Sequence, residues 1–157
     1  MPFCANESNG CVTVTLDDDF SLEDTLTSGQ TFRWVRFRDG FIGIVGERVC
    51  YVTQNDNVVV FHGCTLNEYN DIWMRYFSFD EDYKAIREHL SYDENVVRAM
   101  SKYSGIRIMR QPLWETVISF IISANRGNRA RPMVGFVPFG LTLLMYLGSL
   151  DKKPPGE

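Results

Sequence analysis

Along the first sixty residues, short apolar runs are separated by polar stretches, and the first of these runs alternates with a period of two. Val12, Val14 and Leu16 alternate with threonines, which is the pattern of a strand with one buried face. Runs rich in Val, Phe, Tyr and Thr predict further strands, separated by turn-forming Asp, Asn and Gly. The predicted strands are Cys11–Leu16, Thr31–Phe37, Phe41–Val45, Val49–Thr53 and Val58–His62. One short helix, opening at Ser21 and ending near Gly29, interrupts an otherwise antiparallel meander.

From Asn67 onward the apolar spacing changes to the helical period of 3.6. Tyr69, Trp73 and Tyr76 fall on one face of the first helix, and Asp80 is expected at the N-cap of the second. The predicted helices are Leu66–Phe77, Glu81–Leu90, Asn95–Tyr103 and Leu113–Ala124. The last is apolar nearly all round, which is typical of a helix packed between other helices. The aromatic residues that we expect to be largely buried are Phe32, Trp34, Trp73 and Phe120.

The charge of the chain is unevenly distributed. A net charge of −4 does not by itself indicate binding to nucleic acid. Between Val97 and Arg131, however, seven basic residues accompany a single acid, so this stretch carries +6 and the remainder −10. Because phosphate contacts depend on local basic density, the stretch is a candidate DNA-facing patch. A solvated basic face would give the same pattern.

Other classes of site have little support in the sequence. The four cysteines form no C-x-x-C pair and the two histidines stand alone, so we expect no metal and no cofactor. The N-terminus has no signal-peptide pattern, which makes a reducing, cytoplasmic location the default expectation. The uncharged run from Met133 to Leu150 is marginal in length for a membrane span, and its Gly and Pro content disfavours one.

Three ordered segments of the chain form recognisable motifs. The first is SGQTFRW at 28–34, and the second is YF at 76–77 with D-x-D-Y at 80–83. The third is GIRIMRQ at 105–111, followed by WE and then by SFIISAN, which ends at Asn125. In type, order and separation these segments resemble the 8-oxoguanine DNA glycosylases, base-excision-repair enzymes of the helix-hairpin-helix superfamily. The resemblance covers roughly Val12–Asn125.

The resemblance implies an α+β fold. An N-terminal antiparallel β-sheet domain with helices, TATA-binding-protein-like, would be followed by the start of an α-helical glycosylase domain. Residues 1–111 would then form the first domain, 112–125 the beginning of the second, and 126–157 a divergent tail, frameshifted or disordered. The implied partner is double-stranded DNA containing 8-oxoguanine, with no membrane contact, for a protein that is a monomer or prone to aggregate.

The resemblance also implies roles for particular residues. Gly29 matches a glycine whose carbonyl accepts the N7–H of the flipped lesion. Guanine instead has a bare acceptor at N7. Placing the Gly29 carbonyl opposite that acceptor would cost about 1–3 kcal/mol. Alternatively, or in addition, Gly29 is the glycine of a helix C-cap. Asn125 matches the asparagine that contacts the orphaned cytosine, although Asn is also a common helix terminator. Independently of the resemblance, the basic stretch makes Arg107, Arg110, Arg126, Arg129 and Arg131 candidates for further DNA contacts.

For the remaining residues of the first motif, structural roles are the simpler interpretation. Phe32 and Trp34 are expected to be core aromatics of a strand, and Arg33 is expected to pair with an acid.

The sequence departs from the family pattern after Asn125. The position of the arginine that contacts the cytosine falls on Ala130, and no L-P-G-[VI]-G-x-K hairpin occurs. The lysines available are Lys84, Lys102, Lys152 and Lys153. None of them follows such a hairpin, and a Schiff-base lysine needs burial or a neighbouring cation. We therefore expect no catalytic residue in this chain.

Three functional hypotheses follow. The first is a truncated or frameshifted 8-oxoguanine DNA glycosylase and abasic-site lyase that is inactive as it stands. The second is a non-catalytic DNA-binding or accessory protein that uses the basic patch. The third is a half-enzyme that needs a partner chain. In each case we expect weak, salt-dependent DNA binding with little preference for damaged duplex.

Overall fold

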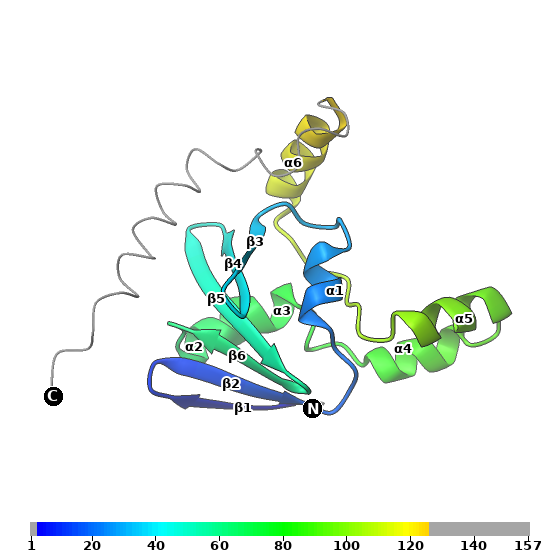
Figure 1. Cartoon of the computed structure of the whole chain (residues 1–157), viewed down its shortest axis with the longest axis horizontal. Coiled ribbons are helices and arrows are strands. Elements are labelled where there is room, and N and C mark those ends of the chain that lie inside the picture. The colour runs from blue at the N-terminus through cyan, green and yellow to red at the C-terminus, as the bar shows by residue number, and fades with distance from the viewer. Residues whose placement is uncertain (1–2, 126–157) are drawn as a thin grey trace, which may run out of the picture.

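The computed structural model describes residues 3–125, in which one antiparallel sheet packs against helices (Figure 1). The strands are β1 (Phe3–Ser8), β2 (Cys11–Leu16), β3 (Trp34–Phe37), β4 (Gly40–Val45), β5 (Arg48–Asn55) and β6 (Val58–His62). Their order across the sheet is β1-β2-β6-β5-β4-β3, and every neighbouring pair is antiparallel. The expected α+β class is confirmed.

The alternation in β2 has the predicted consequence. Val12, Val14 and Leu16 are buried, and Val12 lies opposite Phe61 of β6 in the register. The sequence predicted five strands, whereas the described residues form six, because β1 was not predicted. An Asn9-Gly10 pair, both with positive φ, forms the turn between β1 and β2. Asn-Gly is the strongest short hairpin signal, and it would have identified the extra strand.

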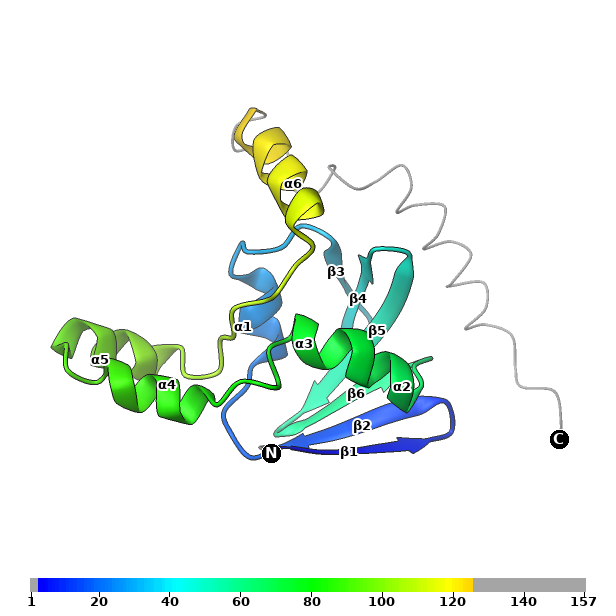
Figure 2. The same cartoon turned by 180° about the vertical axis from the view of Figure 1, so that it is seen from behind.

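Five helical segments accompany the sheet. They are α1 (Leu22–Thr27), a continuous helix made of α2 (Leu66–Glu68), a π-helical turn (Tyr69–Trp73) and α3 (Met74–Tyr76), and then α4 (Tyr83–Leu90), α5 (Glu94–Lys102) and α6 (Leu113–Asn125). Thr65 and Glu68 form a capping box at the start of α2. Figure 2 shows the α2–α3 helix lying across one face of the sheet.

The N-cap of α4 differs from the expected one. Asp82, not Asp80, accepts a hydrogen bond from the amide of Ala85, at 2.9 Å. The Asp80 carboxylate pairs instead with Arg110, at 2.8 Å. The N-cap prediction was wrong because three consecutive acids, residues 80–82, compete for this position. The ion pair with Arg110 engages Asp80, and Asp82 caps the helix.

The core is aromatic and lies between the sheet and the α2–α3 helix. Trp34 and Trp73 are buried as predicted, with ring centroids 6.2 Å apart. The indole N–H of Trp34 donates to the hydroxyl of Tyr76 at 2.9 Å. Phe32 is only half-buried, and Phe120 is 46% exposed, so the burial predicted for Phe120 was wrong. Phe120 meets Phe32 edge to face, with ring centroids 5.1 Å apart.

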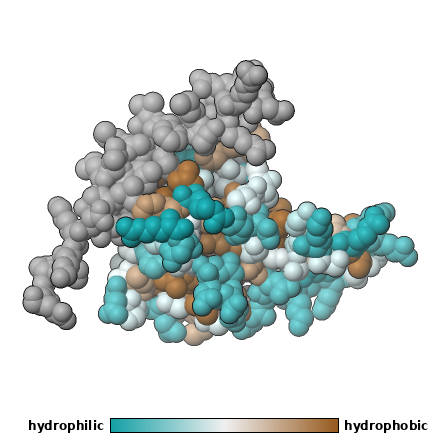
Figure 3. All heavy atoms as spheres, viewed as in Figure 1, coloured by the Kyte–Doolittle hydropathy of each residue, from teal (hydrophilic) through white to brown (hydrophobic). Residues whose placement is uncertain are grey.

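Exposed apolar side chains are confined to the second half of the described chain. The large exposed hydrophobic residues are Ile86, Leu90, Tyr92, Val97, Tyr103, Ile108, Leu113, Trp114, Val117, Phe120 and Ile121. Figure 3 shows apolar residues interspersed with hydrophilic ones on the surface around α4 and α5. Within residues 3–125 no helix is long and apolar enough to cross a membrane. The uncharged run 133–150 lies outside the described residues, as does the expected tail 126–157.

Candidate functional site

Gly29 follows α1 in a sharply defined turn. The hydroxyl of Ser21 accepts from the amide of Asp24 at 3.1 Å and caps the start of the helix. At the other end Ser28 keeps helical geometry, and Gly29 has φ +88. This is the left-handed C-cap conformation in which a β-carbon is strained, so the expected C-cap role is observed. Gly29 is exposed, and no donor within residues 3–125 hydrogen-bonds to its carbonyl.

The Gln30 side chain connects the first motif to the third. Its Nε2 donates to the carbonyls of Thr25, at 3.0 Å, and Arg107, at 2.9 Å. Its Oε1 accepts from the amide of Met109 at 2.9 Å. In return the Gln111 side chain donates to the Gln30 carbonyl at 2.6 Å. Because both amide atoms of Gln30 are engaged, the turn is held rigidly against residues 107–111.

Gly105 allows this segment to approach α1 closely. A β-carbon on Gly105 would lie 2.6 Å from the backbone nitrogen of Ser21. The Gly105 carbonyl accepts from that nitrogen at 2.8 Å. The Thr25 hydroxyl accepts a hydrogen bond from the amide of Arg107 at 3.2 Å. The third motif therefore packs directly against α1 and the turn that follows it.

Arg107 does not face DNA. Its residue exposure is 1%, and its guanidinium donates to the carbonyl of Ser78 at 3.0 Å and lies 3.5 Å from Asp18. The same group stacks over the ring of Tyr83, 4.4 Å from the centroid. Burial lowers the pKa of Arg107, while Asp18 opposes that shift. The expectation that Arg107 contacts phosphate is corrected, because a guanidinium that is buried and paired with Ser78 and Asp18 cannot reach the backbone of a DNA molecule outside.

The other expected DNA contacts fall in three groups. Arg110 is exposed but pairs with Asp80 at 2.8 Å and also with Glu81. Its charge is therefore largely offset by its neighbours. Asn125 is the last residue of α6. The remaining expected contacts, Arg126, Arg129 and Arg131, lie outside the described residues.

Two contacts fix α6 beside the Gly29 turn. Arg33 forms an ion pair with Glu115, as expected for a residue that pairs with an acid. Phe32 packs on Phe120. The first motif thus contacts both the segment before α6 and α6 itself.

The lysines within residues 3–125 stand on the exposed surface. Lys84 lies on α4 and Lys102 on α5, in helices that contain no buried residue. Lys152 and Lys153 lie outside the described residues.

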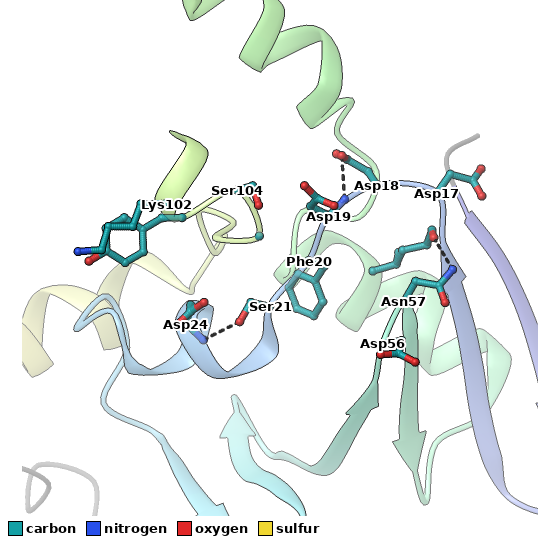
Figure 4. A pocket seen from close by; sticks show the side chains of 13 residues that line it. Asp17, Asp18, Asp19, Phe20, Ser21, Asp24, Asp56, Asn57, Lys102 and Ser104 are labelled. Carbon is teal, nitrogen blue, oxygen red and sulfur yellow. Dashed lines mark hydrogen bonds between the residues drawn. The ribbon is translucent and has the colours of Figure 1, made fainter. Parts of the chain in front are cut away.

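A cavity of 590 Å³ lies at the start of α1, and no sequence motif indicated it. Figure 4 shows its lining, in which the acidic side chains are Asp17, Asp18, Asp19, Asp24 and Asp56. Among the described residues, Lys102 is the only basic one that lines it. Such a cavity repels phosphate. Within the described part of the chain, no group of three or more His, Cys, Asp or Glu side chains is arranged to hold a metal ion.

Comparisons with known proteins agree with this geometry. A family model described as 8-oxoguanine DNA glycosylase, N-terminal domain, matches residues 13–117. The structure of MBOgg1 in complex with a low-affinity DNA ligand is 36% identical with a TM-score of 0.76, over 85% of this chain and 46% of that one.

The Clostridium acetobutylicum 8-oxoguanine glycosylase/lyase is also similar. Its apo form is 35% identical with a TM-score of 0.77, over 85% of this chain and 47% of that one. Its complex with double-stranded DNA containing cytosine opposite 8-oxoguanine gives 34% identity and a TM-score of 0.75, over 85% and 46% of the two chains. The present chain therefore spans about half the length of these relatives.

Proposed function

Because this chain belongs to the 8-oxoguanine DNA glycosylase family, we propose that it serves base-excision repair by recognising oxidised guanine in duplex DNA. The observation that carries the proposal is the Gly29 turn. It is exposed, it has left-handed geometry, and the Gln30 side chain holds it through three hydrogen bonds. A preformed turn of this kind loses little freedom on binding a ligand.

The chemistry of recognition rests on one backbone acceptor. An oxidised guanine carries a hydrogen at N7, whereas guanine presents a lone pair there. The Gly29 carbonyl would accept from the first and repel the second once the base is extruded from the helix. An acceptor left unpaired or repelled in a closed pocket costs about 1–3 kcal/mol, which is enough for useful selectivity.

We further propose that the 157-residue chain by itself carries out neither base release nor strand cleavage. The two described lysines support this. Lys102 lines the acidic cavity together with Ser21 and Asp24, at the end of α1 opposite to Gly29. Lys84 is exposed on α4, and Figure 1 shows α4 and α5 projecting away from the turn. Neither lysine has the buried setting that a Schiff-base nucleophile requires.

A purely electrostatic DNA-binding role is less well supported. It depends on the basic patch, but Arg107 is buried and Arg110 is paired with two acids. The phosphate contacts that remain would come from fewer cations than the sequence contains, and each contributes about 0.9 to the salt slope of log K.

The test uses the purified chain with duplexes that contain either 8-oxoguanine or guanine opposite cytosine. We expect no released base and no borohydride-trapped adduct, with the Clostridium acetobutylicum enzyme as positive control. Binding by the chain alone should be weak, strongly reduced by salt and similar for both duplexes, because Gly29 is exposed and its carbonyl discriminates only where a closed pocket surrounds the extruded base. A trapped adduct that disappears in Lys84→Ala or Lys102→Ala would overturn the proposal that the chain is inactive by itself.

A further inference from the structure

A thiol and an imidazole lie side by side on the outer face of the sheet. Cys11 of β2 and His62 of β6 are direct partners in the antiparallel register, and His62 is in turn the partner of Tyr51 of β5. Cys11 alternates with Val12, which belongs to the core, so its side chain lies on the face opposite the α2–α3 helix. The order of the strands therefore brings together two side chains that are 51 positions apart in the sequence.

The His62 ring is placed to act as a base for the Cys11 thiol. Its Nδ1 lies 3.6 Å from the Cys11 sulfur, and its Nε2 lies 2.9 Å from the hydroxyl of Thr53. With the hydrogen on Nε2, the ring donates to Thr53 and accepts the thiol hydrogen at Nδ1. A nucleophile, a base within hydrogen-bond distance and a third group that orients the base form the arrangement by which proteins activate a thiol.

Two further groups favour proton transfer from the thiol to the ring. Tyr51 stacks on His62, with ring centroids 4.7 Å apart, and its hydroxyl donates to the carboxylate of Asp39. Burial lowers the pKa of His62, so the ring is unprotonated at neutral pH and can accept a proton. The charge of Asp39 opposes this shift, and it therefore stabilises the imidazolium once it has formed.

The four cysteines differ in ways that separate activation from exposure. Cys50 and Cys64 are buried, and burial raises the pKa of both thiols. Cys4 is exposed, and its sulfur accepts from the side-chain amide of Asn6 at 3.5 Å. Cys11 is only partly exposed, but it has the histidine beside it. Exposure alone would make Cys4 the most reactive thiol, whereas activation by a base makes it Cys11.

We propose that Cys11 is a nucleophilic thiol that forms mixed disulfides with small disulfide-containing molecules, and that His62 is its general base. The thiol proton moves to Nδ1 while the Cys11 sulfur attacks one sulfur of the disulfide. A new S–S bond forms as the old one breaks, and the released thiolate takes the proton from the imidazolium. A thiolate leaving group needs no donor other than that imidazolium. The proposal goes beyond the proposed function and does not depend on DNA binding.

Thiol–disulfide exchange on the full chain tests the proposal, with dithiodipyridine as an uncharged, chromogenic disulfide. Absorbance gives the rates, and mass spectrometry of peptides assigns each rate to a cysteine. We expect Cys11 to react about tenfold or more faster than Cys4 in the folded chain. In urea, where the fold is lost, the two rates should converge. A folded chain in which Cys4 reacts as fast as Cys11 overturns the proposal.

Two variants test the base. His62→Gln should slow exchange at Cys11 by about tenfold or more and leave Cys4 unchanged. Thr53→Val, which removes the partner of Nε2 but keeps the shape of the side chain, should slow it by about two- to tenfold. Thr13→Val is the matched control, because Thr13 lies on the same face of β2, two positions from Cys11, and should have no effect.

Circular dichroism shows whether each variant is folded. Unchanged exchange at Cys11 in a folded His62→Gln variant overturns the proposal. If that variant does not fold, equal rates in Thr53→Val and Thr13→Val overturn it instead.

Discussion

The residues up to Phe79 and those from Tyr83 onward contrast in where their apolar side chains lie. The first region contains the sheet, α1 and the α2–α3 helix, and it encloses its own core. Met109 is the only core member that comes from beyond Phe79 within the described chain. In the second region α4 and α5 bury no residue, and α6 presents its apolar face to solvent. Amphipathic patterning therefore produces a closed structure only where a second layer of secondary structure is present to cover the apolar side.

The Gly29 turn belongs to the closed region, although half of its support comes from the segment that leads to α6. Gln30 bonds to the backbone at Arg107 and Met109, and both of these residues are buried. The candidate recognition element is thus built by contacts internal to residues 3–111. The open helices are not needed to hold it in shape.

The contrast predicts opposite outcomes for two tryptophans. Trp34→Ala should lower the free energy of unfolding by about 3–5 kcal/mol, because it empties a buried aromatic site. Trp114→Ala removes a side chain that is 74% exposed, and should change it by no more than about 0.5 kcal/mol. Urea unfolding measures both. Similar losses in the two variants would mean that α6 is packed as tightly as the core.

A smaller effect is expected for the arginine that joins the two regions. Arg107→Ala leaves the carbonyl of Ser78 and part of the Asp18 carboxylate without their partner. The cost should be about 3 kcal/mol, at the low end for a broken buried pair, because Asp18 keeps its ion pair with Arg87. Arg110→Ala, at an exposed pair, should cost about 1 kcal/mol or less. An Arg107 variant of full stability that binds DNA more weakly would restore the DNA-facing interpretation.

The smallest effect concerns pH and the outer face of the sheet. Burial lowers the pKa of His62 below its ordinary value of 6.5, while Asp39 opposes the shift. The unfolded chain therefore takes up a proton at a higher pH than the folded chain does. Stability from His62 is present above about pH 6.5 and is lost as pH falls towards the folded pKa, with a slope below about 1.4 kcal/mol per pH unit.

The pH dependence of unfolding tests the assignment to His62. His62→Gln should flatten this part of the stability profile. The two ring nitrogens of His62 lie 3.6 Å from the Cys11 sulfur and 2.9 Å from the Thr53 hydroxyl. A profile that keeps its slope in His62→Gln would contradict the assignment.

Much of the fold could be predicted from local pattern. Alternation located β2, runs rich in Val, Phe, Tyr and Thr located β3 to β6, and the Ser21 and Gly29 signals bracketed α1. The π-helical turn at Tyr69–Trp73 has no sequence signature, because its side chains keep a helix-like spacing. Strand β3 begins at Trp34 rather than Thr31, since the residues before it are bound to the third motif.

The candidate site was only partly predictable for a physical reason. The geometry of Gly29 follows from its position after a helix, which is local information. The burial of Arg107 depends on Asp18, which lies 89 positions away in the sequence. The local density of charge does not contain this information, and it wrongly predicted an exposed Arg107. The acidic cavity has the same origin, since Asp56 and Lys102 meet Asp17–Asp19 only in the folded chain.

Lesion selectivity in a chimera tests recognition of oxidised guanine through the Gly29 turn. Residues 13–117 of this chain would replace the matched part of the Clostridium acetobutylicum enzyme, which supplies the rest of the fold. We expect the chimera to excise 8-oxoguanine in preference to guanine. Gly29→Ala should slow that excision by roughly 5- to 30-fold, the equivalent of about 1–2 kcal/mol of left-handed strain at the turn. Thr27→Ala, on the exposed side of α1, should have no effect. A folded chimera without activity would contradict recognition of the lesion through the Gly29 turn. So would a chimera in which Gly29→Ala keeps the rate and selectivity of its parent.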